Sequence, residues 1–273
     1  MLRRISFLDN IIPKRVKFLV SALSHFVFLS VFILFWGEGG NFKTAGVLCL
    51  FSSLLFVYPI LFGLKIGSFI RSLSVPLIFI FSSFYVLNYF PNLNVFFKLA
   101  FGVFSSFVYY FLLLSYNVFF VVEEKGSSIP LLRPARTAFL LIEIVALFLF
   151  LTSLYKFVLP EPLTEGTFLF QAVIIGFVTY YFVEQYWFSQ NLEQEVISFV
   201  GNESLTISFM ITISAISLSF FSTESFFRAL ALSTVFYVSI TFFQSVVTHK
   251  LNRLQYIEYI VIFLIVICFL LIA

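Results

Sequence analysis

Charged residues are scarce in this sequence of 273 residues, where Asp, Glu, Lys and Arg together make up only 11%. Soluble domains carry about 25% charged residues, and disordered chains combine low hydrophobicity with a high net charge. A water-soluble fold and a disordered chain are therefore both excluded. The formal net charge of +3 is too small to indicate a nucleic-acid partner.

Cysteine and histidine are also rare, with two residues of each type. Cys49 and Cys268 form no CxxC pair, and neither His25 nor His249 has an acidic residue close to it in the sequence. Disulfide frameworks, zinc sites and redox dithiols need such groupings. Phosphate-binding glycine loops and the GxSxG nucleophile motif are missing as well. The sequence therefore predicts no metal, no cofactor and no catalytic residue that can be named.

Apolar residues dominate instead, since 61% of the chain is hydrophobic and 43 residues are Phe. A helix that crosses a bilayer core of roughly 30 Å needs about 20 mostly apolar residues. Nine runs with few or no charges approach this length: 18–36, 45–64, 73–90, 99–122, 137–159, 167–188, 205–221, 229–247 and 256–273. They do not alternate between apolar and polar residues as the strands of a membrane barrel do. The prediction is an all-α, polytopic transmembrane helix bundle with nine spans. Eight spans are the alternative, because the run 205–221 is short and rich in Ser and Thr.

The positive charges between these runs predict the orientation of the chain. Lys and Arg gather in the short loops that face the cytoplasm. If the N-terminus is cytoplasmic, the segments on that side hold 12 Lys and Arg residues and the outer segments hold 4. We therefore expect a cytoplasmic N-terminus. The loop 189–204 contains no Lys or Arg, so the local topology and the exact span count stay open there.

Two regions are predicted from the distribution of charge. Residues 1–17 form a basic cytoplasmic or interfacial segment that can bind anionic lipid, or a tail whose charges only set the topology. Residues 18–273 form a single transmembrane helical domain with short loops. The expected surroundings are the lipid bilayer of a cell membrane, and the Phe-rich, Asp-poor composition favours a prokaryotic cytoplasmic membrane. Oligomeric state and partner subunits stay open.

One carboxylate, Glu143, lies well inside a predicted span. Ionisable residues at such depth are costly and usually serve a function. Arg136 precedes Glu143 by about two helical turns, or about 10 Å, and the end of span 167–188 brings further polar residues to the same side. The predicted pocket on the cytoplasmic side of spans four to six consists of Asn117, Arg133, Arg136, Glu143, Tyr181, Glu184 and Gln185. In the alternative interpretation, Arg136 and Glu184 mark the membrane interface and Glu143 only fixes helix packing.

Three function classes fit this pattern. A carrier for a small molecule or lipid would use the Glu143 pocket for binding or for proton coupling. A membrane enzyme acting on a lipid-linked substrate would use Glu143 or Glu184 as a base and Arg133 and Arg136 as phosphate clamps. A non-catalytic scaffold subunit would need none of these residues for chemistry. Because buried polar groups are scarce, the sequence favours the carrier over the enzyme.

Overall fold

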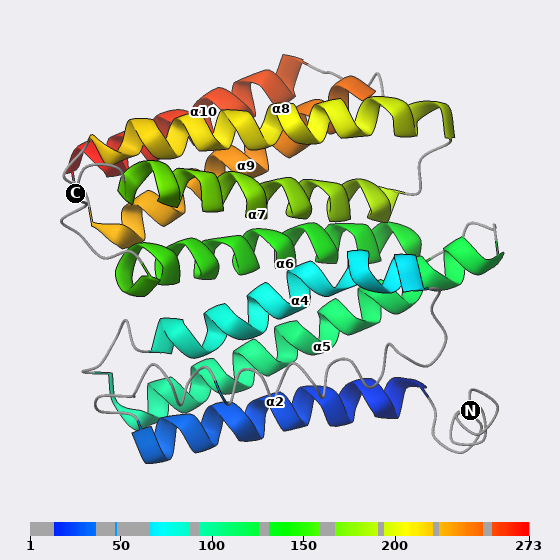
Figure 1. Ribbon diagram of the computed structural model, residues 1–273, viewed down its shortest axis with the longest axis vertical. Helices are drawn as coiled ribbons and strands as arrows, with labels where there is room; N and C mark the ends of the chain where they lie inside the picture. The colour runs from blue at the N-terminus through cyan, green and yellow to red at the C-terminus, as the bar shows by residue number, and fades with distance from the viewer. Residues whose placement is uncertain are drawn as a thin grey trace. The chain divides into compact units, whose positions relative to one another are not determined.

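The computed structural model describes residues 14–36, 47, 66–87, 93–125, 131–158, 167–190, 194–220, 224–247 and 253–272. Every regular element within these ranges is helical, so the all-α prediction is confirmed (Figure 1). The eight α-helices are α2 (Lys14–Trp36), α4 (Ile66–Val86), α5 (Val95–Lys125), α6 (Leu132–Ser153), α7 (Thr167–Gln190), α8 (Gln194–Ser219), α9 (Ser225–Val247) and α10 (Arg253–Ile272). A π-helical turn, η2 (Leu154–Val158), continues α6.

Eight of the nine predicted spans overlap with a described helix, and the second, 45–64, lies outside the described residues except for residue 47. Within the described residues, five helical segments are long and apolar enough to cross a membrane by length and composition: Arg15–Leu34, Val95–Val122, Leu132–Lys156, Phe168–Gln190 and Ser225–Val247. Two more apolar stretches, Ser74–Val86 and Tyr256–Val266, are shorter. These helices support a multi-pass membrane protein, while the count of nine and the orientation stay predictions.

Two helices begin well before the predicted hydrophobic runs, by seven and eleven residues, whereas the starts of the other helices differ by at most five residues. Helix α4 starts at Ile66 instead of residue 73, so it includes Arg71 and has Pro76 in its interior. Helix α8 starts at Gln194 and continues without a break through the acidic segment into the predicted span 205–221. Charge limits which residues can lie in hydrocarbon, but it does not end the backbone hydrogen bonding of a helix. The runs therefore located the apolar parts of these helices better than their ends.

The chain divides into two compact units, Met1–Ile142 (unit one) and Glu143–Ala273 (unit two), with the boundary inside α6. In unit one, α2 packs along α5, and α4 contacts both helices. In unit two, α7 packs along α8, α9 contacts α8 and α10, and the π-helical turn contacts α9. The assignment of 18–273 to one domain stays a prediction, and residues 1–13 of the basic segment lie outside the described ranges.

Apolar side chains cover the outer faces of the helices as well as their inner faces. Phe96, Phe170 and Phe209 are more than half exposed, although each belongs to a helix whose opposite face is buried. A helix that is hydrophobic on all sides is typical of a membrane span or of the interior of a large protein. The exposed Phe and Leu side chains are therefore suited to contact lipid.

Helices α7 and α8 approach each other closely at Gly176. The Ser208 hydroxyl of α8 donates a hydrogen bond of 2.5 Å to the Gly176 carbonyl oxygen of α7. A Cβ atom at position 176 would collide with the Thr212 hydroxyl, which itself donates to the Ser208 carbonyl at 2.8 Å. Small residues let membrane helices come this close. The Ser and Thr residues of α8 thus serve packing at this crossing.

Candidate functional site

Glu143 lies in the middle of α6 and its side chain is 0% exposed. Its neighbours one turn away, Phe139 and Ala146 with Leu147, are equally buried and apolar. Neither carboxyl oxygen of Glu143 has a hydrogen-bond partner among the described residues. An ion pair with Arg136 is therefore not formed in this structure. An ionised carboxylate without partners costs several kcal/mol in a low-dielectric interior, so Glu143 needs a proton, a cation or a donor group of a ligand.

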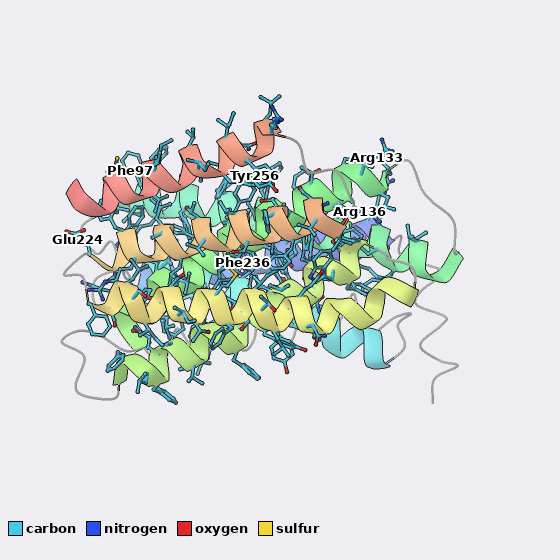
Figure 2. All side chains as sticks on the ribbon, turned by 90° about the horizontal axis from the view of Figure 1, so that it is seen from above. Phe97, Arg133, Arg136, Glu224, Phe236 and Tyr256 are labelled. Atoms are coloured by element: carbon cyan, nitrogen blue, oxygen red, sulfur yellow. The ribbon has the colours of Figure 1, made fainter. Side chains whose placement is uncertain are left out.

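Two arginines lie near the start of α6, in the part of the helix that belongs to unit one. Figure 2 shows Arg133 and Arg136 at the same end of this helix. Arg133 is exposed, whereas Arg136 is half-buried and takes part in other interactions. Asn117, in the preceding helix α5, is half-buried. Arg133 is thus exposed, as a charged residue at the membrane interface would be, whereas Arg136 and Asn117 are only partly covered.

The polar residues near the end of α7 separate into two environments. The Tyr180 hydroxyl donates a hydrogen bond of 2.8 Å to the Glu184 carboxylate one turn later, and both side chains are half-buried. Tyr181 is 37% exposed, whereas Gln185, the next residue on its helical face, is 1% exposed. The i,i+4 spacing therefore joins Tyr180 to Glu184 by a hydrogen bond, while Tyr181 and Gln185 differ in their surroundings.

The seven predicted pocket residues fall on both sides of the boundary between the units. Asn117, Arg133 and Arg136 belong to unit one. Glu143, together with Tyr181, Glu184 and Gln185, belongs to unit two. Their convergence on one pocket therefore stays a prediction, and the firm observation is the isolated, buried carboxyl of Glu143.

A buried polar cluster in unit one was not predicted from the sequence. Ser105 of α5 donates a hydrogen bond of 3.0 Å to the Ser83 hydroxyl of α4, and its oxygen lies 3.4 Å from Nε2 of His25 in α2. The hydroxyls of Ser21 and Tyr109 lie 3.3 Å apart and join α2 to α5 a second time. Three helices are thus linked through side-chain hydrogen bonds. The sequence signal was only a lone histidine and scattered serines, which do not reveal their partners.

Aromatic rings surround the imidazole of His25. The centroids of Phe79, Phe84 and Tyr109 lie 6.4, 5.8 and 5.3 Å from its own. The ring of Phe84 meets it edge-on, and its side chain is 0% exposed. Such packing fixes the orientation of the imidazole and excludes water from it. This cluster is built to hold the three helices together.

No protein family, no curated protein and no solved structure matches the chain significantly. The function therefore has to be inferred from the side chains themselves.

Proposed function

We propose that the protein is a membrane carrier for a small molecule or lipid, in which Glu143 binds a proton or a cationic group of the cargo. The supporting observation is the isolation of this carboxyl, which is fully buried in α6 and has no hydrogen-bond partner among the described residues. Ionisable residues within membrane spans usually face the interior of the helix bundle, and they often mark the pathway of a substrate, an ion or a proton.

The same isolation favours a carrier over the other two function classes. A general base must lie within hydrogen-bond reach of the proton that it removes, and it is usually oriented by a neighbouring group. Glu143 has no such orienting partner in the part of the chain that is described. A purely structural carboxyl would gain most by pairing, as the polar side chains of unit one do. The carrier is the function class that gives an unpartnered carboxyl a role.

The proposal includes a topology with nine spans and a cytoplasmic N-terminus, in the cytoplasmic membrane of a prokaryote. It is supported by the 12 to 4 distribution of Lys and Arg between alternate loops. Reporter fusions after Asn41 and Glu161 should then read the outer side, and a fusion after Gly126 should read the cytoplasm. A cytoplasmic reading at Ala273 would favour eight spans.

Chemical labelling of the carboxyl tests the carrier proposal. A hydrophobic carbodiimide dissolves in the bilayer and reacts with protonated carboxyl groups that it can reach. We expect it to add one label at Glu143 in the folded, membrane-embedded protein, detected by mass spectrometry of the α6 peptide. Glu143→Gln should abolish the label and keep the melting temperature, because the amide preserves size and hydrogen-bonding capacity.

Vesicles that contain the full chain and a trapped pH-sensitive dye provide the functional measurement. We expect proton movement when small amines or amino acids are added outside, and we expect Glu143→Gln to abolish it. A structural carboxyl gives the opposite pattern, with no label in the folded state and a lower melting temperature for Glu143→Gln. That pattern, or vesicle activity equal to that of the wild type in Glu143→Gln, would rule the proposal out.

A further inference from the structure

Two carboxyl groups of the predicted pocket, Glu143 and Glu184, differ in how their charge can be held. The Tyr180 hydroxyl donates a hydrogen bond of 2.8 Å to Glu184, whose side chain is half-buried, so a donor group compensates this charge. Glu143 is 0% exposed, and neither of its carboxyl oxygens has a hydrogen-bond partner among the described residues. Because a lone charge is costly in such surroundings, Glu143 must bind something that neutralises it.

The charge balance of this buried carboxyl limits what can neutralise it. A single proton or a single monovalent cation gives a net charge of zero, whereas both together, or one divalent cation, leave a positive charge without a partner. Calcium and magnesium also need about six oxygen ligands. Within the described residues, no group of three or more His, Cys, Asp or Glu side chains could hold a metal ion. A proton and a monovalent cation therefore exclude each other at Glu143.

The face of α6 that carries Glu143 indicates the kind of cation. Ala146, Leu147 and Phe150 follow Glu143 by three, four and seven residues, the spacing at which side chains share one face of a helix. All three side chains are apolar and at most 7% exposed. A hydroxyl or amide group of the cargo would lose its hydrogen bonds to water here and find no replacement on this face. A cation whose charge is surrounded by apolar substituents has no such hydrogen bonds to lose.

We infer that the cargo is a monovalent organic cation with apolar substituents, and that the carrier exchanges it for one proton at Glu143. Binding of the cation releases the carboxyl proton to water, and binding of a proton releases the cation. Charge balances in each step, because the carboxyl loses one proton for every cation that it takes up. Zwitterionic amino acids do not belong to this class, since they bring a carboxylate of their own. This inference rests on the proposed carrier function and names its substrate class and its coupling.

Proton release on binding tests the exchange without any transport measurement. Tetraphenylphosphonium is the probe, because it is a permanent lipophilic cation that has no proton of its own to release. We expect the full-length protein in a weakly buffered solution of neutral detergent to release about one proton for each cation bound, measured with a pH-sensitive dye. Because the two ligands compete, the dissociation constant should rise about tenfold for each unit by which the pH is lowered. Binding without proton release, or an affinity that does not depend on pH, overturns the exchange.

Three variants decide whether Glu143 is the residue that releases the proton. Glu143→Gln has no proton to release, so the release should disappear and the affinity should fall by about tenfold or more. Glu143→Asp keeps the carboxyl and should keep the release, which separates loss of the charge from damage to the fold. Glu203→Gln is the matched control, because it removes another carboxyl of unit two that is half-buried and has one oxygen without a partner among the described residues. Equal release from Glu143→Gln and the wild type would overturn the assignment.

Two further probes separate failure of this inference from failure of the carrier proposal. Choline is a monovalent cation with a hydroxyl group and little apolar surface, and Mg²⁺ is divalent, so we expect neither to release protons from the protein. If choline releases protons as well as tetraphenylphosphonium does, the apolar substrate class is wrong. If no cation releases protons while Glu143→Gln still abolishes proton movement in vesicles, the carrier proposal stands and this inference is wrong. If the vesicle measurement also shows no dependence on Glu143, both are wrong.

Discussion

Unit one and unit two treat their buried polar side chains differently. In unit one, His25, Ser83 and Ser105 are linked across three helices, and the hydroxyls of Ser21 and Tyr109 meet between α2 and α5. Each contact removes an unsatisfied group and joins two helices at the same time. In this unit, the buried polar side chains link the helices to one another.

In unit two, three large buried polar groups stay isolated. The carboxyl of Glu143, the phenol of Tyr155 and the Nε2 atom of Gln171 have no hydrogen-bond partner among the described residues. Unit one also contains two such atoms, the hydroxyls of Ser30 and Ser106, but a hydroxyl is cheaper to bury than a carboxyl. Polar side chains thus link three helices in unit one, whereas in unit two several large buried polar groups have no partner among the described residues, and α7 and α8 pack closely at Gly176.

The largest effect is expected where unit two relies on packing. Gly176→Val places two methyl groups where even a Cβ atom would meet the Thr212 hydroxyl. We expect it to lower the free energy of unfolding by about 3 kcal/mol, the upper end of the usual cost of overpacking. Unfolding by SDS titration in mixed micelles measures this value.

Gly201→Val is the matched control, because nothing lies within 4 Å of a Cβ atom at that position and residue 201 is exposed. Its effect should be small. Equal losses in the two variants would show that the close approach of α7 and α8 contributes nothing to stability.

A smaller loss of stability should follow when the hydrogen bonds between the helices of unit one are removed. Ser105→Ala removes the hydrogen bond to Ser83 and the contact with His25, so we expect a loss of about 1 to 2 kcal/mol in the free energy of unfolding. Ser24→Ala serves as the control, since Ser24 donates only to the Ser21 carbonyl of its own helix. A Ser105→Ala variant as stable as Ser24→Ala would contradict a structural role for the cluster.

The smallest changes in the free energy of unfolding are expected when the hydroxyls of two buried tyrosines are removed. Tyr109→Phe removes a hydroxyl that has a partner, and it should cost about 0.6 kcal/mol, the average for a hydrogen bond between membrane helices. Tyr155→Phe removes a hydroxyl that has no partner among the described residues, and it should cost nothing. Both free energies of unfolding come from the same SDS titration. If the two losses are equal, the contrast between the units does not hold for their tyrosines.

Hydrophobic runs predicted the helical architecture well, because the length of an apolar run in the sequence indicates by itself which residues form a helix long enough to cross a membrane. They misplaced the starts of α4 and α8, since the backbone continues as a helix through Arg71 and through the acidic residues before Leu205. Glu143 was found because a charge inside an apolar run is visible without any partner. Identifying this residue therefore requires no knowledge of which helices are neighbours.

The polar clusters could not be predicted in the same way. His25 lies 80 residues from Ser105 in the sequence, and only the packing of α2 against α5 brings them together. Tyr155 carries a different difficulty, because a π-helical turn changes the face to which a residue belongs. Periodicity with 3.6 residues per turn assigns such a residue to the wrong neighbours. Contacts between helices and local changes of helical pitch are the information that a single sequence lacks.

The placement of Glu143 within α6 also bears on how the chain is made. A carboxyl at the centre of a nascent span opposes its transfer from the translocon into lipid by about 2.5 to 3.5 kcal/mol. The segment from Thr137 to Tyr155 contains twelve Leu, Ile, Val and Phe residues, each of which favours transfer by about 0.3 to 0.6 kcal/mol. The combined free energy of transfer that these residues contribute exceeds the cost of the single carboxyl. Helix α6 can therefore enter the bilayer during synthesis without another helix to shield Glu143.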